Sequence, residues 1–192
     1  MAKNVGASSR KTPPIFLIII GSGLIIIAIA VILLVVKDDN PGVRSIGDGP
    51  VPKVVSYQAP KLDLVDLSGN PASLDLVDGQ VLLINNWATW CPPCRAEMPI
   101  LETYYRAHKD EGFILIGINA GDKQDQVEEF ASQYQLTFPL WLDPTGQAIY
   151  AFKNNALPSS YVIDRSGMIR LVWVGSVSIE ALETYLTPIL SD

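Results

Sequence analysis

The stretch "LLINNWATWCPPCRAEMP" (residues 82–99) contains both cysteines of this 192-residue chain, Cys91 and Cys94, with two prolines between them. The apolar run at 81–85 that opens it is typical of a strand buried on both faces. After the cysteines, apolar residues follow at spacings of three and four, which predicts one buried stripe of a helix: Met98, Leu101 and Tyr105. The cysteine pair therefore lies where a buried strand gives way to a helix.

Three kinds of site use two cysteines at this spacing. A structural zinc site needs four ligands, and two cysteines with a single histidine are too few. A structural disulfide between Cys91 and Cys94 would close a very small loop and restrict the unfolded chain little. A reversible dithiol fits the strand-to-helix context best. At a helix N-terminus, free N–H groups and the helix dipole favour the thiolate of Cys91, which is the attacking species in disulfide exchange.

The rest of the chain alternates between strand and helix patterns from residue 61 onward. Apolar runs predict strands at 61–67, 81–85, 113–118, 138–142, 160–164 and 168–174. Stripes at helical spacing predict helices after the cysteines, near 127–134, and at 179–189. This alternation of strands and helices predicts an α/β fold with a central mixed sheet, because crossovers give parallel pairs and the turn at 164–167 gives an antiparallel hairpin.

The segment "NWATWCPPCRAEMP" (86–99) resembles the active site of the thioredoxin superfamily. More narrowly, it is similar to the membrane-anchored TlpA, ResA and CcmG group of thiol-disulfide oxidoreductases, whose domain is of the redoxin or AhpC-TSA type. The resemblance covers residues 58–190 and implies a thioredoxin-like fold, with an extra helix and strand inserted at about 123–142. The segment "LPSSYVID" (157–164) is similar to the family segment whose proline is cis, which implies a cis peptide bond before Pro158.

The resemblance also implies roles for individual residues. Cys91 is the exposed nucleophile, and Cys94 is the buried thiol that resolves the mixed disulfide, so the two form a redox-active disulfide. Pro158 faces this disulfide and shapes the groove that receives the substrate. The other residues expected along this groove are Trp90, Pro92, Pro93 and Leu157.

Glu97 matches an acid that this group places near the cysteines. Six residues before the first cysteine, plain thioredoxin has a buried aspartate, whereas this chain has Asn85, which cannot take a proton. Glu97 is therefore the candidate acid–base group for Cys94. The alternative is structural, since an acid in the first turn of a helix interacts favourably with the helix dipole. His108 is interpreted as structural, because it lies far from the cysteine motif.

The two prolines predict the direction of the redox chemistry. If Cys91 caps the helix, Pro92 and Pro93 take its first two positions, and Pro93 has no N–H to offer the thiolate. One close backbone donor then remains, that of Cys94, so the thiolate is only modestly stabilised. We therefore expect a reducing protein, with a potential nearer about −270 mV than about −120 mV.

The N-terminal part of the chain predicts a membrane anchor. Residues 15–36 carry no charge, and as a helix they would be about 33 Å long, enough to cross a hydrocarbon core. A cleaved signal peptide is the alternative, but its apolar region would usually be shorter. Residues 1–14 contain basic and no acidic residues, which places them in the cytoplasm and the remainder outside. We expect a linker at 37–57, unless a short strand at 53–57 docks on the domain, and a thioredoxin-like domain at 58–192.

These features predict a single-pass protein of the bacterial plasma membrane with an extracytoplasmic catalytic domain. Its expected activity is that of a protein-disulfide reductase in cell redox homeostasis, without metal, flavin or nucleotide. The formal charge of −6 argues against a nucleic-acid partner. The resemblance implies oxidised apocytochrome c as substrate, hence a role in cytochrome c biogenesis, and a membrane electron donor of the CcdA or DsbD type. The alternatives are a thiol peroxidase of the redoxin group, with antioxidant activity, and a metallochaperone or binding module on the same fold.

Overall fold

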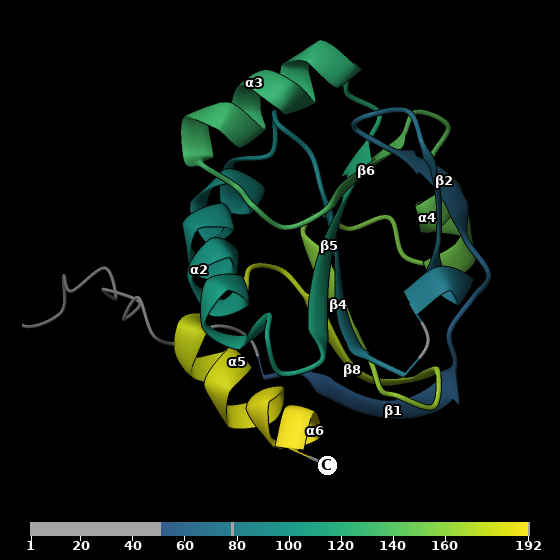
Figure 1. Cartoon of the computed structure of the whole chain (residues 1–192), viewed down its shortest axis with the longest axis vertical. Helices are drawn as coiled ribbons and strands as arrows, with labels where there is room; N and C mark the ends of the chain where they lie inside the picture. Colours follow the sequence, from purple (N-terminus) through teal and green to yellow (C-terminus); the bar gives the residue numbers. More distant parts are fainter. Residues whose placement is uncertain (1–50, 78, 192) are drawn as a thin grey trace, which may run out of the picture. The chain divides into compact units, whose positions relative to one another are not determined.

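The computed structural model describes residues 51–77 and 79–191, which form one eight-stranded mixed sheet with helices on both faces (Figure 1). The predicted cytoplasmic tail and membrane anchor lie outside the described residues. No helix among the described residues is long and apolar enough to cross a membrane.

The sheet has the order β1-β8-β7-β4-β5-β6-β2-β3. Its strands are β1 (Lys53–Gln58), β2 (Asp63–Asp66), β3 (Pro71–Ser73), β4 (Val81–Trp87), β5 (Phe113–Ala120), β6 (Leu140–Asp143), β7 (Ser159–Ile163) and β8 (Met168–Val174). The β4–β5 and β5–β6 pairs are parallel, and the other pairs are antiparallel. Strand β4 lies at the centre and is buried along its whole length, as its apolar run predicts.

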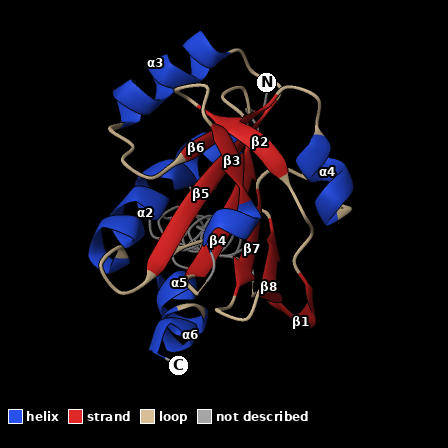
Figure 2. Ribbon diagram, turned by 45° about the vertical axis from the view of Figure 1, so that its right-hand side comes forward, coloured by secondary structure: helices blue, strands red, loops and turns tan. Residues whose placement is uncertain are grey.

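The helices divide between the two faces of the sheet (Figure 2). They are α2 (Pro92–His108), α3 (Gln124–Tyr134), α4 (Gln147–Phe152), α5 (Ile179–Tyr185) and α6 (Thr187–Ser191), with a short 3₁₀ helix, η1 (Leu74–Val77). Helices α2, α3, α5 and α6 pack over one apolar core, which includes both cysteines. Helix α4 covers the second core on the opposite face. The cysteine-bearing helix α2 thus packs on this face of the sheet, with α3 near one of its ends and α5 and α6 near the other (Figure 1).

The predicted α/β fold is confirmed, and the helix and strand expected at about 123–142 are present as α3 and β6. The strand alternative for 53–57 is also confirmed, because β1 pairs with β8, so these five residues of the expected linker belong to the sheet. Almost every residue of β1 is exposed, which explains why its sequence shows no buried period. The helix predicted at 179–189 is wrong as a single helix. It divides between α5 and α6, where Pro188 lacks the N–H that a continuous helix would need.

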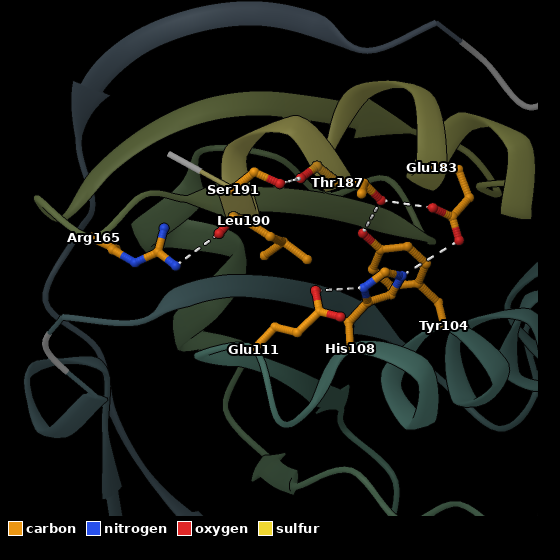
Figure 3. Close-up of polar contacts among 8 residues, drawn as sticks. All are labelled: Tyr104, His108, Glu111, Arg165, Glu183, Thr187, Leu190 and Ser191. Atoms are coloured by element: carbon orange, nitrogen blue, oxygen red, sulfur yellow. Dashed lines mark hydrogen bonds and ion pairs between the residues drawn. The ribbon is translucent and has the colours of Figure 1, made fainter.

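Side chains tie the end of α2 to the C-terminal helices (Figure 3). The Tyr104 hydroxyl lies 2.9 Å from the Thr187 hydroxyl. The His108 ring contacts two carboxylates, with Nδ1 at 3.0 Å from Glu111 and Nε2 at 3.4 Å from Glu183. Burial lowers the pKa of His108, but the hydrogen bonds and charges of the two glutamates outweigh burial, so its pKa is raised overall. His108 therefore has a structural role, as interpreted from the sequence.

The substitution His108→Gln should destabilise the domain in a pH-dependent way. A raised pKa means that the ion pairs contribute fully below about pH 6.5 and lose their contribution as the pH rises through the folded-state pKa. Because the side chains of Glu111 and Glu183 are 53% and 48% exposed, we expect only about 1 kcal/mol more loss at pH 6 than at pH 9. Urea unfolding at the two pH values measures the difference. Tyr104→Phe is the control, with an equal loss at both, and an equal loss for His108→Gln would contradict this account.

Candidate active site

Cys91 and Cys94 form a disulfide at the N-terminus of α2, with their Cα atoms 5.3 Å apart. Cys91 is the N-cap of the helix, and its Sγ accepts a hydrogen bond of 3.3 Å from the backbone N–H of Cys94. Pro92 and Pro93 take the first two helical positions, as predicted. The sulfur of Cys91 thus has one close backbone donor from the first turn of the helix.

The exposure of the two cysteines differs less than expected. In this disulfide form Cys91 is 4% exposed and Cys94 is fully buried, so the expectation of an exposed nucleophile is wrong for the oxidised state. The physical reason is that Cys91 belongs to the apolar core cluster together with Cys94. The surface around it is provided by Pro92 and Pro93, which are exposed, and by Trp90, which is 67% exposed. An attacking thiol can reach the disulfide only at Cys91.

The Glu97 carboxylate lies inside the protein, one helical turn beyond Cys94. Its Oε1 accepts a hydrogen bond of 2.8 Å from Asn85 Nδ2, and its Oε2 accepts one of 3.0 Å from the Val177 N–H. Burial raises the pKa of Glu97 to about 7, although both hydrogen bonds act to lower it. A carboxyl group with such a pKa can accept or donate a proton near neutrality.

The structural alternative for Glu97 is wrong in its geometry. Helix α2 begins at Pro92 and has no acidic residue in its first turn, so Glu97 cannot serve as a first-turn partner of the helix dipole. Burial of a carboxyl group costs free energy unless its oxygens are hydrogen-bonded. Both oxygens of Glu97 have a donor, from β4 and from the segment after β8.

The peptide bond between Leu157 and Pro158 is cis, which confirms the prediction from the resemblance. Pro158 is buried, and Leu157 packs against the core cluster that contains the cysteines. The carbonyl of Pro158 accepts a hydrogen bond of 2.9 Å from the Gly175 N–H. Pro158 therefore lies beside the segment that joins β8 to α5.

This β8–α5 loop contacts three predicted site residues with three consecutive residues of its own. Gly175 donates to Pro158, the Ser176 hydroxyl donates to the Pro93 carbonyl at 3.2 Å, and the Val177 N–H donates to Glu97. No motif in the sequence indicates the role of this loop, because two of its three bonds come from backbone N–H groups that nearly every residue type carries.

The turn before Cys91 is held from both sides at Thr89. The Thr89 N–H donates to Asp122 Oδ2 at 2.7 Å, and the Thr89 carbonyl accepts from Arg95 Nη1 at 3.2 Å. The guanidinium of Arg95 lies over two rings of α3, at 5.4 Å from the ring centroid of Phe130 and 5.7 Å from that of Tyr134. Helix α3 thereby helps to fix the segment that carries Trp90 and Cys91, a contact that no motif predicts. The sequence did carry one signal, because Phe130 and Tyr134 share a face of the predicted helix.

Hollows in the surface are small near the site. One of about 250 Å³ lies beside this turn and is lined by Thr89, Arg95, Gln126, Glu129, Phe130 and Gln133. Hollows of about 570 and 630 Å³ lie elsewhere, at the β2–β3 hairpin and along β1. In the part of the chain that the structure describes, no group of three or more histidine, cysteine, aspartate or glutamate residues could hold a metal ion.

The chain is similar in sequence and in fold to known thiol-disulfide oxidoreductases. Residues 55–172 match the model of the AhpC/TSA family. The thiol-disulfide oxidoreductase ResA of Geobacillus kaustophilus is 33% identical over 135 residues, which cover 70% of this chain and 78% of that protein. ResA of Oceanobacillus iheyensis is 31% identical over 173 residues, covering 86% of this chain and 85% of its own length. Among solved structures, a thiol:disulfide interchange protein of the thioredoxin family from Chlorobium tepidum superimposes with a TM-score of 0.64 at 28% identity, covering 72% of this chain and 99% of that one.

The substitution Glu97→Gln should change how stability depends on pH. Folding raises the pKa of Glu97 from 4.5 to about 7, so the folded state binds the proton more tightly, and the wild type loses stability as the pH rises through this range. Glutamine carries no charge, so the variant should gain about 3 kcal/mol relative to the wild type between pH 4.5 and pH 8. Urea unfolding of the oxidised proteins measures this gain.

The matched control for this prediction is Glu129→Gln, which removes an exposed carboxylate from α3, beyond the first turn of that helix. It should leave the pH profile of the wild type unchanged. If the free energies of unfolding of the wild type and of Glu97→Gln changed equally with pH, folding would not raise the pKa of Glu97, and this prediction would be wrong.

Proposed function

This chain belongs to the AhpC/TSA family and is a thiol-disulfide oxidoreductase, and we propose that it works as a membrane-anchored reductase of extracytoplasmic protein disulfides. The observation that carries the proposal is the surroundings of the Cys91–Cys94 disulfide. Cys91 caps a helix N-terminus and is 4% exposed, and Cys94 is fully buried one turn from a carboxyl group with a pKa of about 7.

The exchange proceeds in two displacements. The Cys91 thiolate attacks one sulfur of the substrate disulfide, whose other sulfur leaves as a thiolate and takes a proton from water. Glu97 then takes the proton of the Cys94 thiol, and the resulting thiolate attacks the Cys91 sulfur and breaks the mixed disulfide. The second sulfur of the substrate leaves as a thiolate and takes the proton that Glu97 received from Cys94, so Glu97 returns to its carboxylate form. The substrate has then gained two electrons and two protons, one proton from water and one from Cys94 by way of Glu97, and the Cys91–Cys94 disulfide remains.

The capping of α2 supports the reducing direction. A thiolate that is strongly stabilised favours the reduced form of a protein and makes the protein oxidising. Here the Cys91 sulfur accepts from the Cys94 N–H, while Pro92 and Pro93 have no N–H to add. A buried carboxylate at Glu97 further disfavours negative charge nearby. Arg95 offers little compensation, because its guanidinium is held against α3 and the Thr89 carbonyl.

The location and the partners follow from the N-terminal sequence and the resemblance. The uncharged residues 15–36 would anchor the chain, and the basic residues before them would keep its N-terminus in the cytoplasm. Apocytochrome c is the proposed substrate, and a membrane reductase of the CcdA or DsbD type is the proposed electron donor. In a Cys94→Ser variant the mixed disulfide cannot be resolved, so partner proteins that stay attached to Cys91 can be identified by mass spectrometry.

The redox potential tests the direction of the exchange. We expect a value nearer about −270 mV than about −120 mV, because the thiolate is modestly stabilised. Equilibration of the full-length chain against glutathione buffers of known ratio measures it, and Cys91→Ser serves as the control that cannot equilibrate. A potential above about −180 mV would make the protein a disulfide donor and would overturn the reductase proposal.

Alkylation in intact cells tests the location and the roles of the two thiols. A membrane-impermeant maleimide should label Cys91 of the reduced protein without lysis, and at least about tenfold faster than Cys94, since Cys94 is completely buried. Peptide mapping of the labelled chain measures both rates. Labelling only after lysis would refute the extracytoplasmic location, and faster labelling of Cys94 would reverse the two roles.

A further inference from the structure

The side chain of Asn85 has an unusual hydrogen-bond pattern. It lies on β4 and is fully buried. Its Nδ2 donates to Glu97 Oε1 at 2.8 Å and to Ser160 Oγ at 3.0 Å. Its Oδ1 is also buried and has no hydrogen-bond partner among the described residues. Such an unpaired oxygen costs free energy, so the arrangement calls for a physical explanation.

A half-turn of the amide about its last side-chain bond exchanges the oxygen and the nitrogen, which are nearly the same size. In the present orientation both N–H donors of Asn85 are used, one by the Glu97 carboxylate. After the half-turn, Oδ1 would lie at hydrogen-bonding distance from Glu97 and Ser160. It could then accept from the O–H of a protonated Glu97 and from the Ser160 hydroxyl, which can rotate to donate.

Both orientations of Asn85 therefore make the same number of hydrogen bonds. Each one uses one end of the amide twice and leaves the other end without a partner. The second oxygen of Glu97 keeps its donor in both states, because the Val177 N–H belongs to the backbone. We propose that Asn85 is a positioning residue whose amide turns with the proton on Glu97, so that Glu97 can hold or release that proton in a buried site without losing a hydrogen bond.

This inference rests on the proposed acid–base role of Glu97. In the resolving step the proton moves from Cys94 Sγ to the Glu97 carboxylate, and no electrons move with it. The N–H of Asn85 that faced the carboxylate would then oppose a new O–H, and the half-turn replaces this repulsion with an O–H···O bond. An aspartate at position 85 would instead place a second carboxylate beside Glu97, and a leucine would leave Oε1 without any donor.

Asn85 is the one side chain among the described residues whose hydrogen bond shifts the pKa of Glu97. Burial, the Val177 N–H and Asn85 are the causes that act on the pKa of Glu97, and no charged side chain is among them. Tyr161 of β7 stacks on Phe152 in the opposite core, and Glu180 of α5 is exposed. In the first three turns of the same helix the other ionisable groups are Cys94, Arg95 and Glu102, with Cys91 at the N-cap, and the last turns carry Tyr104, Tyr105, Arg106 and His108. The two cysteines are joined in the disulfide, Arg95 is held by α3, and Glu102 is held by Thr137 and Arg106.

The experiment follows the titration of Glu97 itself in the oxidised full-length chain, where the thiols do not titrate. The probe is the carboxyl signal in NMR spectra of protein labelled with ¹³C in glutamate, and its absence from Glu97→Gln identifies it. Asn85→Leu should raise the titration midpoint of Glu97 by about one unit, because a donor to a carboxylate is about twice as strong as a bond to the neutral acid. Asn85→Asp should give two coupled steps, since two adjacent carboxyl groups share a proton.

The matched control is Asn86→Leu. Asn86 has the same residue type, strand and burial, but strand alternation points it to the opposite face of the sheet. It should leave the midpoint unchanged. A midpoint for Asn85→Leu within about 0.2 unit of the wild type, or an equal shift in Asn86→Leu, would overturn the proposal.

If Asn85→Leu fails to fold, the titration of Asn85→Asp tests the proposal in its place. A single titration step of Glu97, with the midpoint of the wild type, would then overturn the proposal. The redox potential separates this proposal from the proposed function. A potential outside the reductase range would remove the reductase activity while leaving the titration result intact. If the protein has the potential of a reductase but the titration of Glu97 is unaltered in the Asn85 variants, only the proposed role of Asn85 is overturned.

Discussion

The burial of one carboxyl group, that of Glu97, is the constraint on which the site depends. A charged group inside a protein must be hydrogen-bonded or neutralised. Here the protein does both in part, because two donors meet the two oxygens and the pKa rises to about 7. These two donors come from β4 and from the loop after β8, so one carboxyl group links the cysteine helix to two separated parts of the chain.

Much of the fold was predictable, because the central elements are buried and burial leaves a periodic pattern. Strand β4 is apolar before its two asparagines and is buried throughout, and the stripe of α3 contains the buried Val127 and Phe130. Strand β1 shows the opposite case. It is held by backbone pairing with β8 while its side chains remain exposed, so no burial pattern marked it and the sequence indicated it only as the alternative to a linker. The division of the C-terminal helix turned on a single missing N–H at Pro188, within an otherwise regular stripe.

The residues of the candidate site whose chemistry depends on their side chains could be predicted from the sequence. The contacts that backbone groups make to these residues could not. Cys91, Cys94 and Glu97 are conspicuous because few other residues could perform their roles. The partners of these residues were less visible, since the Gly175 and Val177 contacts use N–H groups. Thr89 is likewise held through its own backbone, by Asp122 and Arg95. The near-complete covering of Cys91 also could not be read from sequence, because it arises from packing around the formed disulfide.

The β8–α5 loop has a consequence for how a bound substrate is sensed. Its three bonds, to Pro158, Pro93 and Glu97, come from neighbouring residues, so a displacement of the loop cannot affect one of them alone. A polypeptide that settles against Pro158 and shifts Gly175 must also change the distance between Val177 and the Glu97 carboxylate. Weakening that bond makes the carboxyl group a stronger base. If a substrate chain in the proposed groove displaced this loop, the basicity of Glu97 would change with it, and through the proposed role of Glu97 so would the readiness of the Cys94 thiol to lose its proton.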